Sequence, residues 1–201
     1  MSRAKVGILI SGRGSNMEAL IEAARAPDYP GEVVLVVSNN PDAEGLAKAA
    51  EAGVATQVID HRPFGKDRAA HERQIDAALQ AAGVEFVALA GYMRVLTPVL
   101  VDAWSGRMIN IHPSLLPAFP GLHTHARVLQ SGAKEHGCTV HLVTSGVDEG
   151  PIVGQARITI LEGDDEDALA RRVLAEEHRL YARCLAELIV QKTMSAVGPS
   201  R

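Results

Sequence analysis

The sequence predicts a single α/β domain built on an open, mostly parallel, twisted sheet. Short apolar runs recur about every 25 residues, and the stretches between them are rich in Ala, Leu, Glu and Gln, which is the pattern of βαβ units. The first runs are continuously apolar rather than alternating, as expected for strands whose two faces are both covered by helices. With 201 residues, 47% of them hydrophobic, the chain can bury one sizeable core.

The predicted strands are the apolar runs Val6–Ile10, Val33–Ser38, Thr56–Ile59, Phe86–Ala90, Met108–Ile111, Cys138–Val143 and Ile152–Ile160. The predicted helices between them are Asn16–Ala26, Ala43–Ala52, Asp67–Ala82 and Thr97–Ala103. The last two strands follow one another without a helix, which indicates an antiparallel addition to the parallel core. A long helix from about Asp165 to Val190 ends the domain, which we place at residues 1–190; residues 191–201 are expected to form a flexible tail.

Charge and composition exclude several classes of function. The 20 Lys and Arg residues against 24 Asp and Glu residues give a net charge of −4, which does not favour a protein that coats nucleic acid. Aromatic residues make up 3% of the chain, too few for a platform on which bases stack. No apolar run is long enough to span a bilayer, and Cys138 and Cys184 form no CxxC motif. We therefore expect a cytoplasmic protein that acts on neither membranes nor nucleic acids.

A turn with two glycines, Ser11–Asn16, joins the first predicted strand to the first predicted helix. It is neither a dinucleotide fingerprint nor a Walker A loop, because Met17 occupies the third glycine position and no Gly-Lys-Ser/Thr follows. Glycines let backbone N–H groups approach an anion closely, and a helix N-terminus adds unpaired donors and a positive dipole. The turn therefore favours phosphate binding, and the alternative is a tight turn that binds nothing.

A second polar group lies at the end of the strand near residue 110. In an extended chain, Asn110 and His112 point to one side while Ile109 and Ile111 anchor the other, and Pro113 ends the strand. Open α/β sheets place their ligands at such strand ends. The alternative is that the amide and the imidazole only cap a turn and bond to each other.

Asp148 lies in a glycine-flanked loop, Ser145–Gly150, between the last two predicted strands. Loop carboxylates are usually solvated turn formers. This loop adjoins the parallel core, however, so that Asp148 could reach His112. A carboxylate beside an imidazole stabilises the protonated ring and produces a general acid near neutral pH.

The remaining histidines do not predict a metal site. His123 and His125 have the spacing of ligands but lack a partnering Cys or an HExxH motif, so chance or a role at a helix start is favoured. His136 and His141 fall on opposite faces of an extended strand. The acidic cluster Glu162–Asp167 fits the start of the last helix, where negative charge stabilises the dipole.

Several motifs in order along nearly the whole chain resemble those of the folate-dependent formyltransferases, and most of all the branch that formylates glycinamide ribonucleotide in purine biosynthesis. The segments that carry the resemblance are the Ser11–Asn16 turn, LAGYMRVL at 89–96, NIHPSLLP at 110–117, PGLHTH at 120–125, EHGCTVH at 135–141, VDEGP at 147–151 and Glu177-His178. The glycine turn alone is weak evidence, but the set is specific. The resemblance implies a Rossmann-like formyltransferase fold.

The resemblance further implies an enzyme that transfers the formyl group of 10-formyltetrahydrofolate to the amine of glycinamide ribonucleotide, giving formylglycinamide ribonucleotide and tetrahydrofolate. It implies three catalytic residues, Asn110, His112 and Asp148. The implied binding residues are Gly14, Ser15 and Asn16 for phosphate, Arg68, Met93, Arg94, Val95, Leu96 and Asn110 for folate, and Glu177 for the ribonucleotide. Leu174 departs from the polar residue that some relatives carry on this side of the pocket.

The residue types suit this chemistry. Attack of an amine on a formyl carbon creates an oxyanion, to which the Asn110 amide and a protonated His112 can donate, and neither a metal nor a covalent nucleophile is needed. The alternatives are a hydrolase that releases formate from the folate, a transferase that formylates initiator methionyl-tRNA, and a non-catalytic folate or nucleotide module. The tRNA enzyme would favour a basic surface, and both enzyme alternatives carry a further domain. A homodimer is possible.

Overall fold

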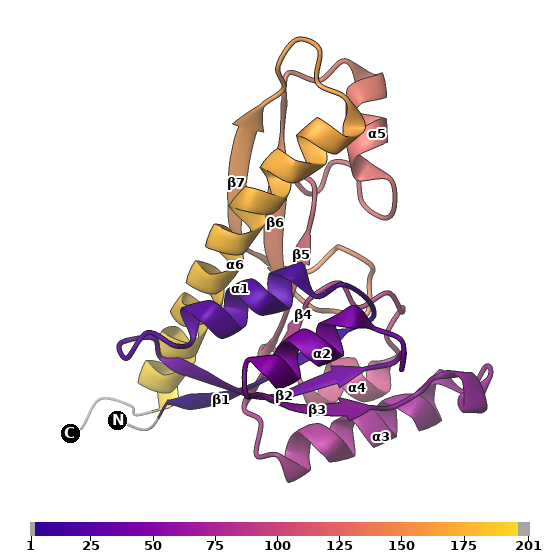
Figure 1. Ribbon diagram of the computed structural model, residues 1–201, viewed down its shortest axis with the longest axis vertical. Helices are drawn as coiled ribbons and strands as arrows, with labels where there is room; N and C mark the ends of the chain where they lie inside the picture. The colour runs from indigo at the N-terminus through magenta and orange to yellow at the C-terminus, as the bar shows by residue number, and fades with distance from the viewer. Residues whose placement is uncertain (1–2, 197–201) are drawn as a thin grey trace.

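The computed structural model describes residues 3–196, which form a seven-stranded sheet with helices on both faces (Figure 1). The strand order is β3-β2-β1-β4-β5-β6-β7. The strands are β1 (Ala4–Ile10), β2 (Gly31–Ser38), β3 (Ala55–Val58), β4 (Phe86–Leu89), β5 (Met108–His112), β6 (Glu135–Leu142) and β7 (Ile152–Thr159). The first five pair in parallel, whereas β6 and β7 pair antiparallel, which confirms the predicted mostly parallel sheet with an antiparallel addition.

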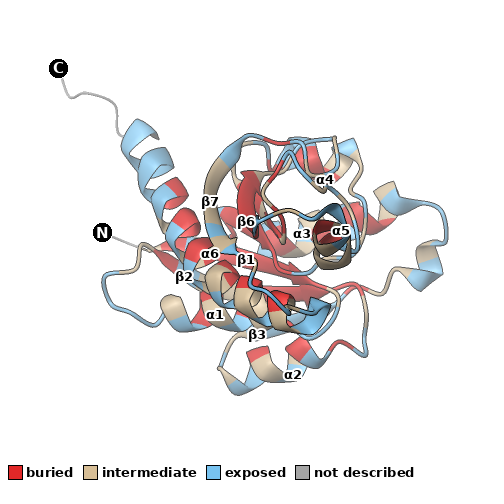
Figure 2. Ribbon diagram, turned by 90° about the horizontal axis from the view of Figure 1, so that it is seen from above, coloured by how far each residue is buried: buried red, intermediate tan, exposed pale blue. Residues whose placement is uncertain are grey.

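Two apolar cores lie on the two faces of the sheet. The helices are α1 (Ser15–Ala23), α2 (Glu44–Glu51), the short 3₁₀ helix η1 (Arg62–Phe64), α3 (Arg68–Ala81), α4 (Pro98–Ala103), α5 (Thr124–Ser131) and α6 (Glu166–Ala196). On one face, α1, α2 and α6 bury side chains such as Met17, Ala49 and Tyr181 against the strands. On the other face, α3 and α4 bury Ile75 and Leu100. The central strands β1, β4, β5 and β6 are therefore largely buried, whereas the edge strands β3 and β7 are exposed or partly buried (Figure 2).

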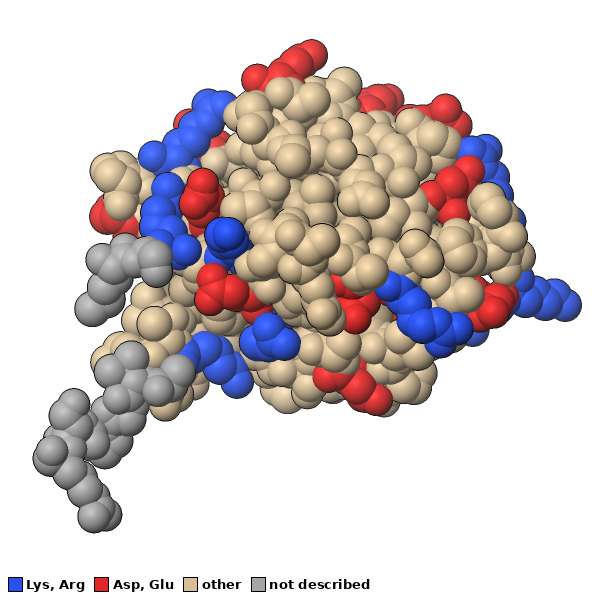
Figure 3. All heavy atoms as spheres, turned by 90° about the horizontal axis from the view of Figure 1, so that it is seen from below, with Lys and Arg blue, Asp and Glu red and all other residues tan. Residues whose placement is uncertain are grey.

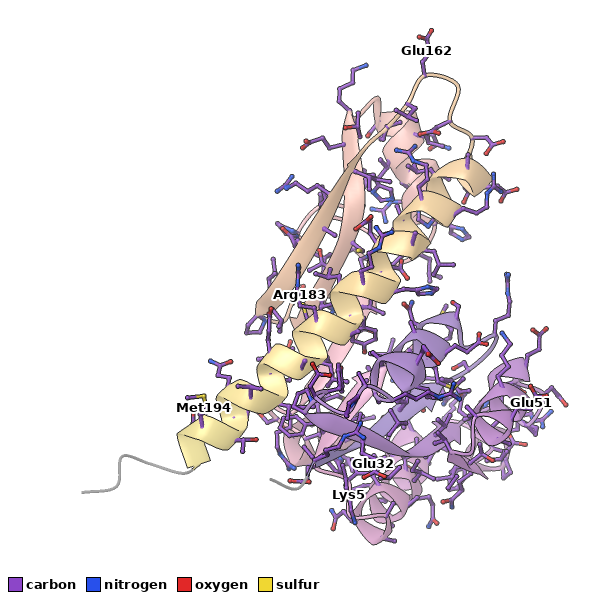
Figure 4. All side chains as sticks on the ribbon, turned by 60° about the vertical axis from the view of Figure 1, so that its left-hand side comes forward. Lys5, Glu32, Glu51, Glu162, Arg183 and Met194 are labelled. Carbon is purple, nitrogen blue, oxygen red and sulfur yellow. The ribbon has the colours of Figure 1, made fainter. Side chains whose placement is uncertain are left out.

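The longest helix, α6, continues farther than the sequence predicted. Figure 4 shows it running from the turn that carries Glu162, past Arg183, to Met194. The predicted end at Val190 is wrong, because residues 191–196 are still helical. No glycine or proline interrupts the chain before Gly198, so nothing in residues 191–196 breaks the helix. The rest of the expected tail, residues 197–201, lies outside the described residues.

Two elements were not predicted, α5 and η1. Helix α5 follows a segment rich in proline and glycine and buries only Thr124 and Val128, so its apolar periodicity is weak. The element η1 is a single turn of three residues with no buried side chain. The predicted start of the long helix near Asp165 is confirmed. Asp165 caps α6, because its Oδ1 accepts a hydrogen bond from the Ala168 N–H at 2.7 Å.

The topology brings the candidate residues to one edge of the sheet. The chain moves from β1 outward to β2 and β3, and later from β4 in the opposite direction to β5. Strands β1 and β4 are thus the switch point at which open α/β sheets form a crevice, at the carboxyl ends of the strands. The Ser11–Asn16 turn after β1, the loop after β4 and Pro113 after β5 all begin at this edge.

Surface charge is mixed on the face shown in Figure 3, where Lys and Arg side chains alternate with Asp and Glu side chains. This face therefore has no basic patch of the kind that tracks a nucleic acid backbone. Of the helices within residues 3–196, none combines the length with the apolar character needed to cross a membrane.

Candidate active site

A cavity of about 740 Å³ opens at the carboxyl edge of the sheet. One wall is the Ser11–Asn16 turn, another is the N-terminal half of α6, and the floor includes Pro113, which directly follows β5. The residues that line it are Ser11, Gly12, Arg13, Gly14, Ser15, Asn16, Lys48, Ala90, Gly91, Met93, Pro113, His125, Asp167, Ala170, Arg171, Leu174 and Glu177. The cavity thus joins the predicted phosphate turn to the strand that carries His112.

The turn after β1 presents backbone donors to this cavity. Gly14 has φ 73°, in the left-handed region, and α1 begins at Ser15 with no side-chain cap on its N-terminal N–H groups. A Cβ on Gly14 would also lie 3.1 Å from the Gly45 Cα, so a side chain there has neither a favourable backbone nor free space. Gly14, Ser15 and Asn16, the residues predicted to bind phosphate, all line the cavity.

Glu177 faces the same cavity from α6. It is buried, and its Oε2 accepts a 2.7 Å hydrogen bond from the Asn16 Nδ2. Burial raises the pKa of Glu177, and the Asn16 hydrogen bond opposes that rise only in part. The other side-chain atom of Asn16, its buried Oδ1, has no hydrogen-bond partner among the described residues. Leu174 lies one turn earlier in the same wall and offers no polar contact there.

Three cationic side chains line this cavity, and the sequence analysis did not single them out. Lys48 Nζ pairs with Glu18 at 2.8 Å. Arg13 and Arg171 have no ion pair within residues 3–196. Asp167 and Glu177 add two carboxyl groups to the same lining, so the cavity as a whole is mixed in charge. Arg13 lies in the turn that ends at the open N-terminus of α1, and this end of the cavity favours an anion.

His112 ends β5 with both ring nitrogens facing acceptors. Its Nε2 lies 3.0 Å from the Phe119 carbonyl oxygen, and its Nδ1 lies 3.3 Å from Asp148 Oδ2. A neutral imidazole has one N–H, whereas the imidazolium has two, so this geometry fits the protonated ring. His112 is buried, with 6% of the residue exposed, so both ring contacts are made in a largely dry setting.

Asp148 connects two loops over the site. Its Oδ2 accepts the Gly121 N–H at 2.9 Å in addition to facing His112. Burial would raise the pKa of Asp148, but the His141 ring, the Gly121 N–H and His112 together outweigh burial and hold that pKa below its usual value. Asp148 is thus a carboxylate at neutral pH. Its backbone is left-handed, with φ 56°.

Asn110 lies on the same side of β5 as His112, as the period of two predicted. Its Nδ2 is 3.3 Å from His141 Nε2, and β5 pairs with β6 so that Asn110 and His141 are directly opposite. The Nδ1 of His141 lies 3.0 Å from the Leu142 carbonyl oxygen, which fixes the ring. The sequence analysis missed His141 as a site residue. The alternation of the predicted strand at 138–143 contained the signal, because it puts Thr139 and His141 on one face.

The predicted folate residues lie in two segments at the same edge. Met93, Arg94, Val95 and Leu96 belong to the loop 92–97 between β4 and α4, and Arg68 is the first residue of α3. Arg68 Nη1 donates to the Val95 carbonyl oxygen at 3.3 Å, so the helix contacts the loop. Met93 and Val95 are 67% and 53% exposed, which leaves apolar surface open to a ligand.

The structure does not gather the other histidines into a metal site. His123 occupies the N-cap position of α5 without a side-chain hydrogen bond to the helix, and His125 Nδ1 bonds to His136 Nε2 at 3.0 Å. Burial, reinforced by His125 and His112, lowers the pKa of His136 to about 4, so the pair is not doubly charged at neutral pH. Within residues 3–196, no group of three or more His, Cys, Asp or Glu side chains could hold a metal ion.

Comparison with known proteins gives one family. The family model described as formyl transferase matches residues 4–185. The phosphoribosylglycinamide formyltransferase of Escherichia coli K12 is 44% identical over 174 residues, which cover 87% of this chain and 82% of that protein. The crystal structure of phosphoribosylglycinamide formyltransferase from Brucella melitensis is 53% identical, with a TM-score of 0.89 over 94% of this chain and 96% of that one.

Longer relatives contain a similar segment. The trifunctional purine biosynthetic protein adenosine-3 of Drosophila melanogaster is 48% identical over 189 residues. The match covers 93% of this chain and 14% of that protein, so the chain spans about a seventh of this relative.

Proposed function

The chain belongs to the formyl transferase family, and we propose that it transfers the formyl group of 10-formyltetrahydrofolate to the amine of glycinamide ribonucleotide. The observation that carries the proposal is the convergence of Asn110, His112 and Asp148 beside a cavity that contains an open helix N-terminus. The first feature suits an oxyanion, and the second suits a phosphate.

The ribonucleotide occupies the cavity. Its phosphate accepts from the backbone N–H groups of Gly14, Ser15 and Asn16 at the start of α1, while Arg13 and Arg171 supply positive charge nearby. A buried acceptor such as the Glu177 carboxylate suits the ribose hydroxyl groups, because a carboxylate accepts but cannot donate. The amine end then points along the cavity toward Pro113 and the end of β5.

The folate occupies the loops beside the cavity. The exposed apolar side chains of Met93 and Val95, with the partly buried Leu96, offer a surface for the flat ring system. Arg68 and Arg94 provide cations for the carboxylates of the co-substrate. These residues place the formyl group near Asn110, which contributes both to folate binding and to catalysis.

Catalysis rests on stabilising the charge that develops on the formyl oxygen. The amine attacks the formyl carbon, and the oxyanion accepts hydrogen bonds from the Asn110 amide and from the N–H at His112 Nε2. In the structure that N–H faces the Phe119 carbonyl oxygen, so the oxyanion either shares it with this oxygen or replaces this oxygen as its acceptor. Asp148 keeps the ring of His112 protonated and oriented. His141 Nε2 lies 3.3 Å from the Asn110 amide nitrogen and so helps to orient that amide.

Protons balance across the reaction. The attacking amine loses one proton as the new C–N bond forms, and N10 of the folate gains one as the old C–N bond breaks. The Asp148 carboxylate and a water molecule can carry the proton between the two nitrogens. No group is oxidised or reduced.

A hydrolase with the same trio is the second candidate, with water as the acceptor. The cavity of about 740 Å³, with the open N-terminus of α1 in its wall, favours a phosphorylated second substrate, which a hydrolase has no use for. The test is a coupled assay with both substrates and purified protein. We expect formylglycinamide ribonucleotide and tetrahydrofolate in equal amounts. Formate and tetrahydrofolate without the formylated ribonucleotide would assign the hydrolase instead, and binding without turnover would assign the non-catalytic module.

The proposed enzyme acts on small molecules in the cytoplasm, where de novo purine synthesis requires both substrates. This assignment rests on the family and on the size of the cavity, about 740 Å³, which suits a small molecule.

A further inference from the structure

A chain of hydrogen bonds joins the phosphate turn to the folate loop. The Met93 N–H lies 2.8 Å from Ser11 Oγ, and Ser11 Oγ lies 2.5 Å from Asn39 Oδ1. Ser11 follows β1, Asn39 follows β2, and Met93 lies in the loop after β4. The chain therefore crosses three neighbouring strands, β2, β1 and β4, at the edge where both substrates bind.

The direction of each bond is fixed by chemistry. A backbone N–H only donates, so Ser11 Oγ is the acceptor for Met93. The single hydroxyl proton of Ser11 then goes to Asn39 Oδ1, which only accepts. Ser11 lines the cavity, but its proton is already used, so it is not a donor to the phosphate in this arrangement. Asn39 is 5% exposed, which makes an unpaired amide oxygen there costly.

The folate loop 92–97 is held at both ends. At its far end, the buried Glu72 of α3 accepts from the Thr97 N–H at 2.7 Å and from the Thr97 hydroxyl at 2.5 Å. At its near end, the anchor is Ser11. Met93 and Val95 are 67% and 53% exposed, and the Val95 carbonyl oxygen also accepts from Arg68. The position of these two exposed residues therefore depends on hydrogen bonds to the loop backbone more than on their own packing.

We propose that Ser11, supported by Asn39, is a positioning residue that fixes the folate loop against the phosphate turn, so that the formyl donor is presented at the right distance from the bound amine. The proposal rests on the proposed function, because it takes loop 92–97 as the folate site. Ser11 acts through Met93 and does not touch the reacting atoms.

The test is a split between kinetic constants. Ser11→Ala removes the acceptor of Met93 and the donor to Asn39, and we expect the KM for 10-formyltetrahydrofolate to rise about 3- to 10-fold, as the loss of one net hydrogen bond does. The KM for glycinamide ribonucleotide should change less than about 2-fold, because the backbone N–H groups of the turn remain. Asn39→Leu should give the same split, and Ser11→Thr, which keeps the oxygen, should restore the wild-type constants.

Ser38→Ala is the matched control. Ser38 is fully buried at the same edge of the sheet, and its hydroxyl bonds to the backbone of Asn40, at 2.8 and 3.0 Å, but not to the folate loop. We expect both KM values to stay at their wild-type levels. An equal rise in both KM values for Ser11→Ala, the same rise in Ser38→Ala, or no recovery in Ser11→Thr would overturn the proposal.

Folding and function are separated by two further measurements. Thermal melting shows whether Ser11→Ala is folded. If Ser11→Ala is not folded, the Kd of 10-formyltetrahydrofolate is measured by calorimetry on Asn39→Leu instead. Wild-type protein that transfers no formyl group would contradict the proposed function. Wild-type protein that transfers normally, with an unchanged folate KM in Ser11→Ala, would contradict only the role of Ser11.

Discussion

The proposed site has two parts, one formed by backbone groups and the other by side chains. The turn proposed to bind phosphate, Ser11–Asn16, offers backbone N–H groups of residues that are adjacent in the chain, at the start of α1. The proposed catalytic part consists of side chains from separate segments, since Asn110 and His112 come from β5, His141 from β6 and Asp148 from the loop before β7. The first part follows the parallel strand β1, and the second lies where the parallel strand β5 meets the antiparallel strand β6.

This difference teaches what each part tolerates. In the phosphate turn, backbone conformation is the requirement, and side chains can vary as long as φ and free space are kept. In the catalytic part, the identity of each side chain is the requirement, because oxyanion stabilisation depends on particular donors. Substitutions should therefore affect substrate binding in the first part and turnover in the second.

The largest effect is expected in the catalytic part. His112→Ala removes one oxyanion donor, and we expect kcat to fall about 100- to 1,000-fold with the ribonucleotide Kd nearly unchanged. Steady-state kinetics with both substrates, and calorimetry for binding, measure the two quantities. The effect should be on turnover because the phosphate turn does not contact His112.

His123→Asn is the control for this prediction. His123 is exposed before α5 and has φ 56°, a conformation that asparagine accepts. Its kcat should stay close to that of the wild type. A His112→Ala enzyme with near-normal turnover would remove His112 from the mechanism.

A smaller effect, on binding, is expected in the phosphate turn. Gly14→Val places a branched side chain at φ 73° and within 3.1 Å of the Gly45 Cα, so the turn must move. We expect the Kd of glycinamide ribonucleotide to rise roughly 10- to 100-fold, equivalent to about 1.4–2.8 kcal/mol, while the folate Kd is spared. Calorimetric titration with each substrate separates the two.

Gly53→Val controls for strain alone. Gly53 has φ 81° with open space around it, and it lies in the turn between α2 and β3, outside the cavity lining. This variant should be less stable but should bind the ribonucleotide as the wild type does. If Gly14→Val left ribonucleotide binding unchanged, the turn would not be the phosphate site.

The smallest effect concerns the stability of the fold, and it involves Glu177 of α6. Burial raises the pKa of Glu177, so its ionised form costs stability when the pH is above the ordinary pKa of a glutamate. Glu177→Gln removes that charge and can still accept from Asn16. At pH 8 we expect Tm to rise by about 2–4 °C, the shift that about 1 kcal/mol gives in a domain of this size, while ribonucleotide binding weakens.

The sign can be checked by varying the pH. A raised folded-state pKa means that the folded protein binds the proton more tightly, so the wild type gains stability as pH falls toward the ordinary glutamate pKa. The difference in Tm between Glu177→Gln and the wild type should therefore shrink from pH 8 to pH 4. A difference that is constant with pH, or a lower Tm for Glu177→Gln at pH 8, would show that the charge of Glu177 is not costly.

Most of the sheet could be predicted from the sequence. All seven predicted strands exist with ends shifted by a few residues, because continuous apolar runs and their turn residues are local signals. The start of β6 at Glu135 was missed, since Glu135 and His136 look polar although His136 is buried. Helix α5 was missed because only a narrow face of it packs on the core.

The site could be predicted in part. The residue types at Asn110, His112 and Asp148 suggested their chemistry, and the distance of 3.3 Å between His112 and Asp148 agrees with the expected contact. The partners contributed by backbone atoms could not be predicted, because the Phe119 carbonyl and the Met93 N–H carry no side-chain signal. The role of Ser11 likewise depends on which strands lie side by side, and that is a property of the topology.

The left-handed backbone of Asp148 limits what evolution or design can do at this position. Among the described residues, three that are not glycine have positive φ, Phe119, His123 and Asp148, and all three lie in loops around His112. For most side chains this conformation costs about 1–2 kcal/mol, whereas aspartate and asparagine adopt it more readily. Glutamate would keep the charge but not the conformation, and asparagine the conformation but not the charge. Stereochemistry and electrostatics thus converge on one amino acid, and attempts to retune the acidity of this centre have more freedom in the neighbours of Asp148 than in Asp148 itself.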